Sequence, residues 1–211
     1  DGAVFRNVDA CLVPSRAIML ELWRGADEPD AHDGHRIVIG VDWGKVGDYT
    51  VASVVCATCA REVELYRGRG AEYAVQRKRL ADQSIMWHAG RILAESNAMG
   101  DPIIEMLRRG EPGKGDGDDG YASLPVQPFA TTAQSKPPLI ESLALSLERA
   151  EVQWLDVPVA TAELAAYERH TSAATGRTSY SAPVGVHDDT VIARALARKA
   201  AGRLGHMATT R

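Results

Sequence analysis

The stretch RIVIGVD, residues 36–42, constrains the fold of this 211-residue chain more than any other feature. Its β-branched residues form a continuous apolar run, which is typical of a strand buried on both faces of a sheet. The run ends in Asp42, and a carboxylate at the end of a buried strand is costly unless a cation lies beside it. We therefore expect a central strand that carries an acid to its end.

The segments that follow predict a mixed α/β fold. Residues 49–57 and 61–68 read as two further strands, and the short connections favour an antiparallel meander with the first. The period then changes to an alternation of helices and strands, so helices should cover both faces of the sheet. The expected elements are helix 71–87, strand 91–96, helix 102–110, strand 124–130, helix 135–150, strand 152–155, helix 160–170, a hairpin or loop over 171–185, and a last helix from Asp188 or Asp189 to about Gly202.

Three segments are expected to lie outside this core. We interpret residues 1–35 as a linker or N-terminal extension with one short helix near Arg16–Trp23, and residues 206–211 as a tail. The Gly- and Asp-rich composition of segment 111–120 predicts a mobile loop. Its residues match neither the phosphate-loop motif nor the calcium-loop motif. The domain itself is expected to span residues 36–205.

The cysteines and the net charge give weaker signals. Cys56 and Cys59 form one C-x-x-C and no second one follows, so we interpret them as small residues at a strand end. A net charge of −4 does not favour nucleic-acid binding, which depends on where basic residues cluster. Arg77, Lys78 and Arg79 are the candidate DNA contacts, although such a stretch is more often a solvated helix face. No apolar run is long enough for a transmembrane helix and no signal peptide is visible, so an intracellular protein is expected.

Four acids stand where an α/β sheet gathers its chemistry. Asp42 and Glu95 end two predicted strands, and Asp188 and Asp189 open the last helix. Converging carboxylates repel one another unless a metal neutralises them, and oxygen ligands alone favour Mg²⁺ or Mn²⁺. Two such ions about 4 Å apart would suit phosphodiester hydrolysis. Individually, Asp42 fits a turn, Glu95 fits a surface position, and either Asp188 or Asp189 fits a helix cap.

Three further residues are supporting candidates. Asp48 is either a turn residue or a group that orders the site, and Lys136 is either solvated or a partner for a phosphate. His187 is either a loop residue or a group near the metals that protonates the leaving oxygen.

Four motifs together resemble the nuclease domain of the phage large terminase subunit. They are GVDWGKVGDYTVASVV, ILAESNAMG, TTAQSKPPLIESLALSLE and APVGVHDDTVIARALA, and the similarity runs from about residue 36 to residue 200. The resemblance implies a ribonuclease H-like fold and a metal-dependent endonuclease that cuts concatemeric double-stranded viral DNA. It implies that Asp42, Glu95 and Asp189 are catalytic residues and metal ligands, and that Asp188 is a further metal ligand. The implied cofactor is a pair of Mg²⁺ or Mn²⁺ ions.

The same resemblance implies partners and a place of action. The expected partners are double-stranded DNA, an ATPase domain of the same full-length chain, the portal and the small terminase subunit, with no membrane. The host cell cytoplasm is the expected location. Three other functions stay open at this point: a Holliday-junction-resolvase-like nuclease, a non-catalytic DNA-binding or portal-docking module, and an actin-like or sugar-kinase-like ATPase fragment.

Overall fold

A seven-stranded mixed sheet forms the centre of the molecule. The computed structural model describes residues 2–44, 48–70, 72–96, 100–115, 118–172 and 176–205. In spatial order the strands of the sheet are β11 (Val126–Phe129), β8 (Arg91–Glu95), β5 (Ile37–Asp42), β6 (Tyr49–Cys56), β7 (Arg61–Arg69), β4 (Leu22–Arg24) and β3 (Arg16–Met19). Strands β5, β6 and β7 are antiparallel neighbours, whereas β8 and β11 run parallel to β5. The predicted mixed sheet is confirmed.

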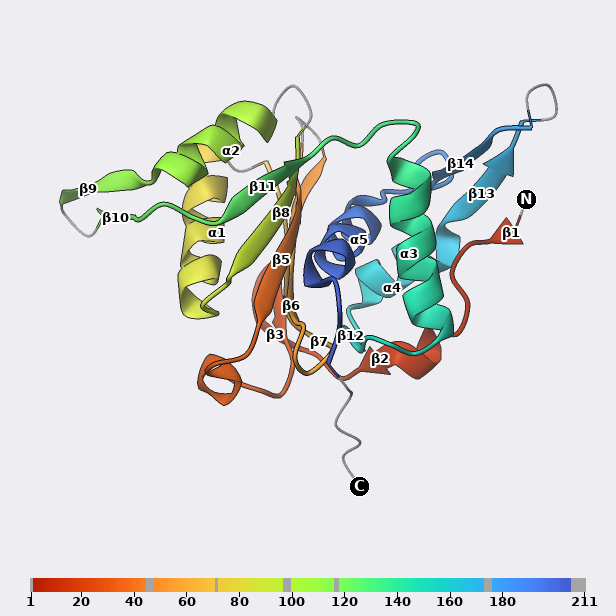
Figure 1. Cartoon of the computed structure of the whole chain (residues 1–211), viewed down its shortest axis with the longest axis horizontal. Helices are drawn as coiled ribbons and strands as arrows, with labels where there is room; N and C mark the ends of the chain where they lie inside the picture. Colours follow the sequence, from red (N-terminus) through yellow and green to blue (C-terminus); the bar gives the residue numbers. More distant parts are fainter. Residues whose placement is uncertain are drawn as a thin grey trace.

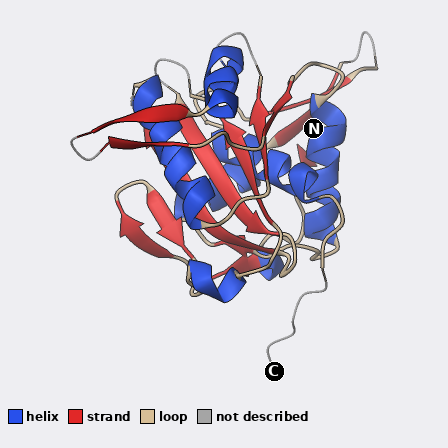
Figure 2. Ribbon diagram, turned by 60° about the vertical axis from the view of Figure 1, so that its left-hand side comes forward, coloured by secondary structure: helices blue, strands red, loops and turns tan. Residues whose placement is uncertain are grey.

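Five α-helices cover the two faces of this sheet. They are α1 (Tyr73–Met86), α2 (Gly100–Arg109), α3 (Lys136–Glu148), α4 (Pro158–Ala166) and α5 (Asp189–Ala201). Figure 1 shows α1 and α2 on one side of the sheet and α3, α4 and α5 on the other. The same layers are visible in Figure 2, where the red strands lie between blue helices. None of the helices in the described ranges is long and apolar enough to cross a membrane.

Smaller strand pairs and two 3-10 helices complete the fold. Strand β1 (Gly2–Ala3) pairs with β13 (Glu168–Thr171), which pairs with β14 (Thr178–Ser181), and β2 (Leu12–Val13) runs parallel to β12 (Trp154–Leu155). Strands β9 (Glu111–Gly115) and β10 (Asp118–Tyr121) form a hairpin. The 3-10 helices are η1 (Asp9–Cys11) and η2 (Pro29–His32).

The alternation along β5 decides which side chain faces which helix layer. Ile37, Ile39 and Val41 belong to the apolar cluster under α1 and α2, whereas Val38 belongs to the cluster around α3 and α5. Because successive side chains point to opposite faces of a sheet, Gly40 and Asp42 face α5. The strand therefore directs its terminal acid towards the helix that begins with the other two aspartates.

Helix α5 lies directly on β5 because residue 40 is glycine. A Cβ atom added to Gly40 would stand 2.1 Å from the carbonyl oxygen of Ala193 and 2.2 Å from the backbone nitrogen of Ala197. The alanines on this face of α5 are buried, and the helix also packs against Leu143 and Leu147 of α3. Small residues on both elements thus allow the close approach that places the start of α5 near the end of β5.

Three sequence expectations about secondary structure were wrong. Residues 16–24 form the strand pair β3 and β4 instead of a short helix, because pairing with the edge of β7 satisfies their backbone. They fall within residues 1–35, the segment that we interpreted as a linker, and extend the sheet. Residues 111–115 and 118–120 belong to the paired strands β9 and β10 and are not simply a loop. The helix expected over 160–170 ends at Ala166, and its last residues belong to β13. Residues 206–211 lie outside the described residues.

Replacing Gly40 by alanine should displace α5, because the new Cβ would collide with rigid helix backbone and not with a flexible side chain. We expect Gly40→Ala to lower the free energy of unfolding by about 3 kcal/mol in urea denaturation. Gly90→Ala is the matched control, since the nearest atom to its Cβ would be 4.0 Å away. Equal stability of the two variants would contradict the close contact between α5 and β5.

Candidate metal-dependent active site

Asp42 and Glu95 end two adjacent parallel strands and lie side by side. Val41 of β5 is in register with Ala94 of β8, so the next residue along each strand brings the two acids to the same edge of the sheet. Burial raises the pKa of the Asp42 carboxyl well above its ordinary value. The nearby charge of Glu95 and a hydrogen bond with its carboxyl group raise this pKa further, followed by the charges of Asp189 and Asp188. The Asp42 carboxyl thus interacts electrostatically with all three other predicted acids.

Asp188 and Asp189 occupy the first positions of α5 without capping it. Asp188 is the N-cap residue, yet its side chain makes no capping hydrogen bond. It accepts a hydrogen bond from the ammonium group of Lys136, with Nζ and Oδ2 3.2 Å apart. The ring of Tyr167 is buried beside it, and burial and the charge of Asp188 raise the pKa of the Tyr167 phenol. The Asp188 carboxylate is therefore not used to cap the helix.

Glu163 of α4 performs the capping instead. Its Oε2 accepts the backbone N–H of Thr190 at 3.0 Å and also the hydroxyl of that residue. Its Oε1 accepts a hydrogen bond from Arg67 at 2.9 Å, and the Arg67 guanidinium lies 3.4 Å from the centre of the Tyr49 ring. Sequence reasoning missed Glu163, because a glutamate within an apolar helix carries no local mark of a contact 27 residues away.

Asp189 is buried and its carboxyl is only partly satisfied. Burial raises its pKa to about 6, and the charge of Glu163 adds to this effect, whereas the nearby His187 lowers it. Among the described residues its Oδ2 atom has no hydrogen-bond partner, and His187 Nδ1 lies 3.5 Å away. An orphaned oxygen in a buried carboxylate is costly, and a bound cation would satisfy it.

The four acids form a shallow cluster and not a tight cage. Among the described residues, no three carboxylate oxygens lie within 4.8 Å of one another, so one ion could not take all the acids without side-chain rotation. The oxygen-only set at positions 42, 95, 188 and 189 fits hard divalent cations such as Mg²⁺ or Mn²⁺.

All three supporting candidates lie beside the acids. His187, Asp48 and Lys136 lie at the acidic cluster: His187 Nδ1 is 3.9 Å from Asp48 Oδ1, and its ring meets that of Tyr49 edge to face. Asp48 directly follows residues 45–47, which lie outside the described residues.

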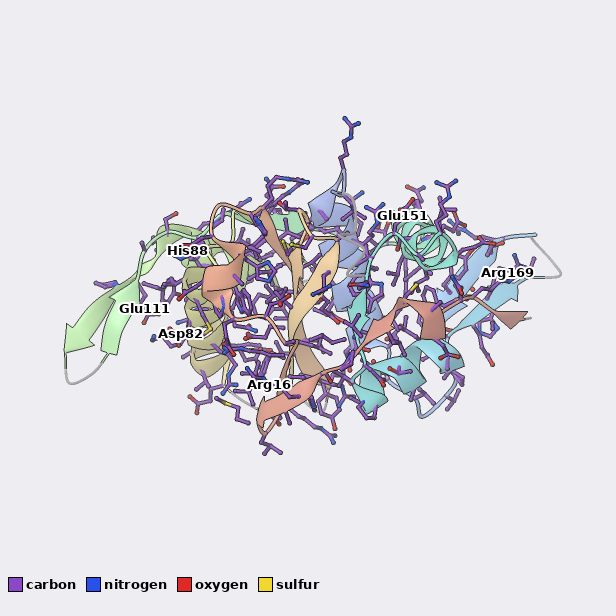
Figure 3. The ribbon with its side chains drawn as sticks, turned by 90° about the horizontal axis from the view of Figure 1, so that it is seen from below. Arg16, Asp82, His88, Glu111, Glu151 and Arg169 are labelled. Atoms are coloured by element: carbon purple, nitrogen blue, oxygen red, sulfur yellow. The ribbon has the colours of Figure 1, made fainter. Side chains whose placement is uncertain are left out.

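The basic stretch of α1 is not brought to the acids. Arg77 pairs with Glu111, Lys78 pairs with Asp82, and the Arg79 guanidinium lies over the ring of Tyr66. Helix α1 covers the face of the sheet opposite to α5. Figure 3 places Asp82 and Glu111 near one end of the molecule and Arg169 of β13 near the other. A DNA-binding role for Arg77, Lys78 and Arg79 stays a prediction.

Known proteins of similar sequence and structure are phage large terminases. The chain is 32% identical over 169 residues to the large terminase subunit of Thermus virus P23-45, a match that covers 80% of this chain and 32% of that protein. The large terminase nuclease of phage G20c with bound magnesium superposes with a TM-score of 0.77 at 27% identity, covering 93% of this chain and 96% of the other. This chain is a homologue of the large terminase nuclease domain.

Further comparisons define the extent of this likeness. The nuclease domain of the Thermus phage P74-26 large terminase has a TM-score of 0.74 at 26% identity and covers 97% of this chain and 99% of its own. No protein-family model matches the sequence. The chain spans about a third of the length of the large terminase subunit from Thermus virus P23-45. The ribonuclease H-like fold expected from the sequence is confirmed.

The raised pKa values predict that the acids destabilise the metal-free domain. Between the ordinary carboxyl pKa and the raised folded values, the folded state holds more protons than the unfolded state, so stability falls as pH rises from about 4 through about 6. We expect Asp42→Asn to raise the melting temperature in EDTA at pH 7.5 by about 2–4 °C, with little effect at pH 4. A variant that melts below the wild type at pH 7.5 would contradict the repulsion.

Proposed function

We propose that this chain is a metal-dependent endonuclease that cleaves double-stranded DNA during viral genome packaging. The observation that carries the proposal is the convergence of Asp42, Glu95 and Asp189 from β5, β8 and α5 in a domain similar to solved terminase nucleases. Asp42, Glu95 and Asp189 are the proposed catalytic residues. Together with Asp188 they are also the proposed metal ligands.

The proposed cofactor is a pair of divalent ions, either Mg²⁺ or Mn²⁺. The solved nuclease of phage G20c has been described with bound magnesium and with bound cobalt, which supports use of a divalent metal. When bound, such ions would activate water and stabilise the leaving 3′ oxygen. The chain's own contribution is a set of carboxylate oxygens carried by a strand pair and a helix start, which would become ligands once their side chains rotate towards the ions.

Two further side chains have proposed roles beside the metals. Lys136 neutralises Asp188 in the structure, and its ammonium group would reach a DNA phosphate if the cation took over that aspartate. His187 is half exposed between Asp48 and Asp189, which suits a group that gives a proton to the leaving oxygen. Asp48 would then hold the imidazolium form.

The partners of the full protein are proposals as well. Double-stranded DNA is the proposed substrate, and an ATPase domain of the same polypeptide, the portal and the small terminase subunit are proposed partners. The likeness to a protein of which the match covers only 32% supports the presence of further domains in the working enzyme. The proposed place of action is the cytoplasm of the infected host.

Plasmid digestion tests the proposal. We expect Mn²⁺ or Mg²⁺ to support nicking and linearisation of supercoiled plasmid, and EDTA to abolish both. Asp42→Asn, Glu95→Gln and Asp189→Asn should each reduce the rate by at least about 100-fold, the upper end of what loss of a metal's outer partners costs. Glu105→Gln is the matched control, because this exposed glutamate pairs only with Arg109 within α2.

Different outcomes distinguish the rival functions. Cleavage that needs four-way junctions would indicate a resolvase-like nuclease, and DNA binding with unchanged background nicking in Asp42→Asn would indicate a non-catalytic module. ATP hydrolysis or nucleotide binding by the isolated chain would favour the ATPase alternative. Full nicking by folded Asp42→Asn, with folding checked by circular dichroism, would remove the proposed site.

A further inference from the structure

A second cluster of metal-binding side chains lies at the other end of the sheet. His32 and His35 come from η2 and the turn after it, and Cys56 and Cys59 come from the end of β6 and the turn into β7. One ligand atom from each of the four lies within 4.8 Å of the others. Among the described residues this is the one His, Cys, Asp and Glu set that converges so tightly.

The distances within the cluster match the edges of a metal-centred tetrahedron. Cys59 Sγ lies 3.3 Å from His35 Nδ1 and 3.7 Å from His32 Nδ1, and Cys56 Sγ lies 3.5 Å from His35 Nδ1. Zinc bonds of about 2.3 Å to sulfur and 2.0–2.1 Å to nitrogen give tetrahedral edges of about 3.3–3.8 Å. Both imidazoles present the same nitrogen, Nδ1, to the sulfurs.

The backbone of both turns is shaped for paired ligands. Each pair has two residues between its members, and each turn contains one residue in the left-handed region: Gly34 with φ 74° and Ala60 with φ 53°. Alanine rarely adopts this conformation, and such strain gathers at sites where the surroundings require it. The N–H of Cys59 also points to Cys56 Sγ at 3.3 Å, and such donors stabilise an ionised sulfur.

The surroundings of the cluster favour neutral imidazoles, the form of histidine that binds metals. His32 is buried, which lowers its pKa and keeps the imidazole neutral. Its Nε2 has no hydrogen-bond partner, and the nearest acid oxygen is Asp27 Oδ2 at 3.7 Å. Cys56 is fully buried, so its sulfur is shielded from water and accessible to the other members of the cluster.

We propose that His32, His35, Cys56 and Cys59 bind one structural zinc ion. Two thiolates and two imidazoles in tetrahedral arrangement select zinc over the hard cations that suit the acidic cluster. All four positions are filled by protein, so the ion has no open position for water or substrate and is not catalytic. The sequence showed the C-x-x-C alone, but the matching H-x-x-H at 32–35 is the signal that would have completed the set.

The two sites lie at opposite ends of the same strands. Cys56 pairs with Ile37 at the start of β5, whereas Asp42 at the end of β5 pairs with Val51. Five residues of strand separate the two ends, about 17 Å at 3.4 Å per residue. The zinc would tie the segment that follows β4 to the turn between β6 and β7, and so anchor the edge strand β3 and its neighbour β4 to the centre of the sheet.

Metal analysis of the 211-residue chain, purified without a histidine tag or chelator, tests the site. We expect about one zinc per chain by mass spectrometry, retained in Asp42→Asn and lost in Cys56→Ser/Cys59→Ser. Cys11→Ser is the matched control, because this buried cysteine contacts the Leu147 carbonyl and lies outside the cluster. Cys56→Ser/Cys59→Ser should melt at a lower temperature yet nick plasmid with Mn²⁺ below that temperature, which separates this site from the acidic one.

Cobalt substitution keeps the proposal testable if the double variant does not fold. We expect Co²⁺ to give the wild type and Asp42→Asn the same visible absorption, with thiolate-to-metal charge transfer and tetrahedral d–d bands. Cys59→Ser should lower the charge-transfer intensity, because it removes one of the two thiolate ligands. Zinc content equal in wild type and double variant would overturn the site, as would a fully reduced chain that fails to bind added zinc. A Cys56–Cys59 disulfide in place of metal would indicate a redox pair instead.

Discussion

The contact between Gly40 and the backbone of α5 is the constraint on which the acidic site depends. Strand β5 delivers Asp42 and helix α5 delivers Asp188 and Asp189, so the distance between these two elements sets the distance between the acids. Only hydrogen at residue 40 leaves room for the Ala193 carbonyl and the Ala197 nitrogen. A larger residue would push the helix away from the strand, and the acids that the two elements carry would move apart with them. One missing methyl group therefore controls the geometry of the site.

A buried ion pair determines how α5 lies on the sheet. Arg194 and Glu62 are both fully buried, with Nη2 and Oε2 2.7 Å apart. Glu62 also accepts hydrogen bonds from Ser53 and from the backbone of Leu155, so its charge is well satisfied. Such a pair contributes little net stability, but a helix rotated out of register would leave a buried charge unpaired. The pair therefore favours the single orientation in which the start of α5 meets the ends of β5 and β8.

The sequence predicted what depends on local patterns and missed what depends on distant partners. The apolar run that ends at Asp42, the strand that ends at Glu95 and the helix that begins at Asp189 are all visible as periods and boundaries. The hairpin over 16–24 was missed because its strand character comes from pairing with β7. The capping role of Glu163 and the match between residues 32–35 and 56–59 were missed for the same reason: each needs a second segment that only the folded chain supplies.

The distribution of stabilising and destabilising groups along β5 and β6 follows from their function. At one end, carboxylates lie close together, and burial and their mutual repulsion raise the pKa values of Asp42 and Asp189, so the ionised acids disfavour the folded state. At a site proposed to bind cations, carboxylates already paired with protein groups would gain little free energy from a bound ion. Stability must come from elsewhere on the same strands. The His and Cys cluster at the opposite end meets that need: it fixes the turn between β6 and β7 without a group that DNA must contact. Because the two clusters lie at opposite ends of the strands, the proposed metal binding by the acids and the proposed stabilisation by the His and Cys cluster do not interfere.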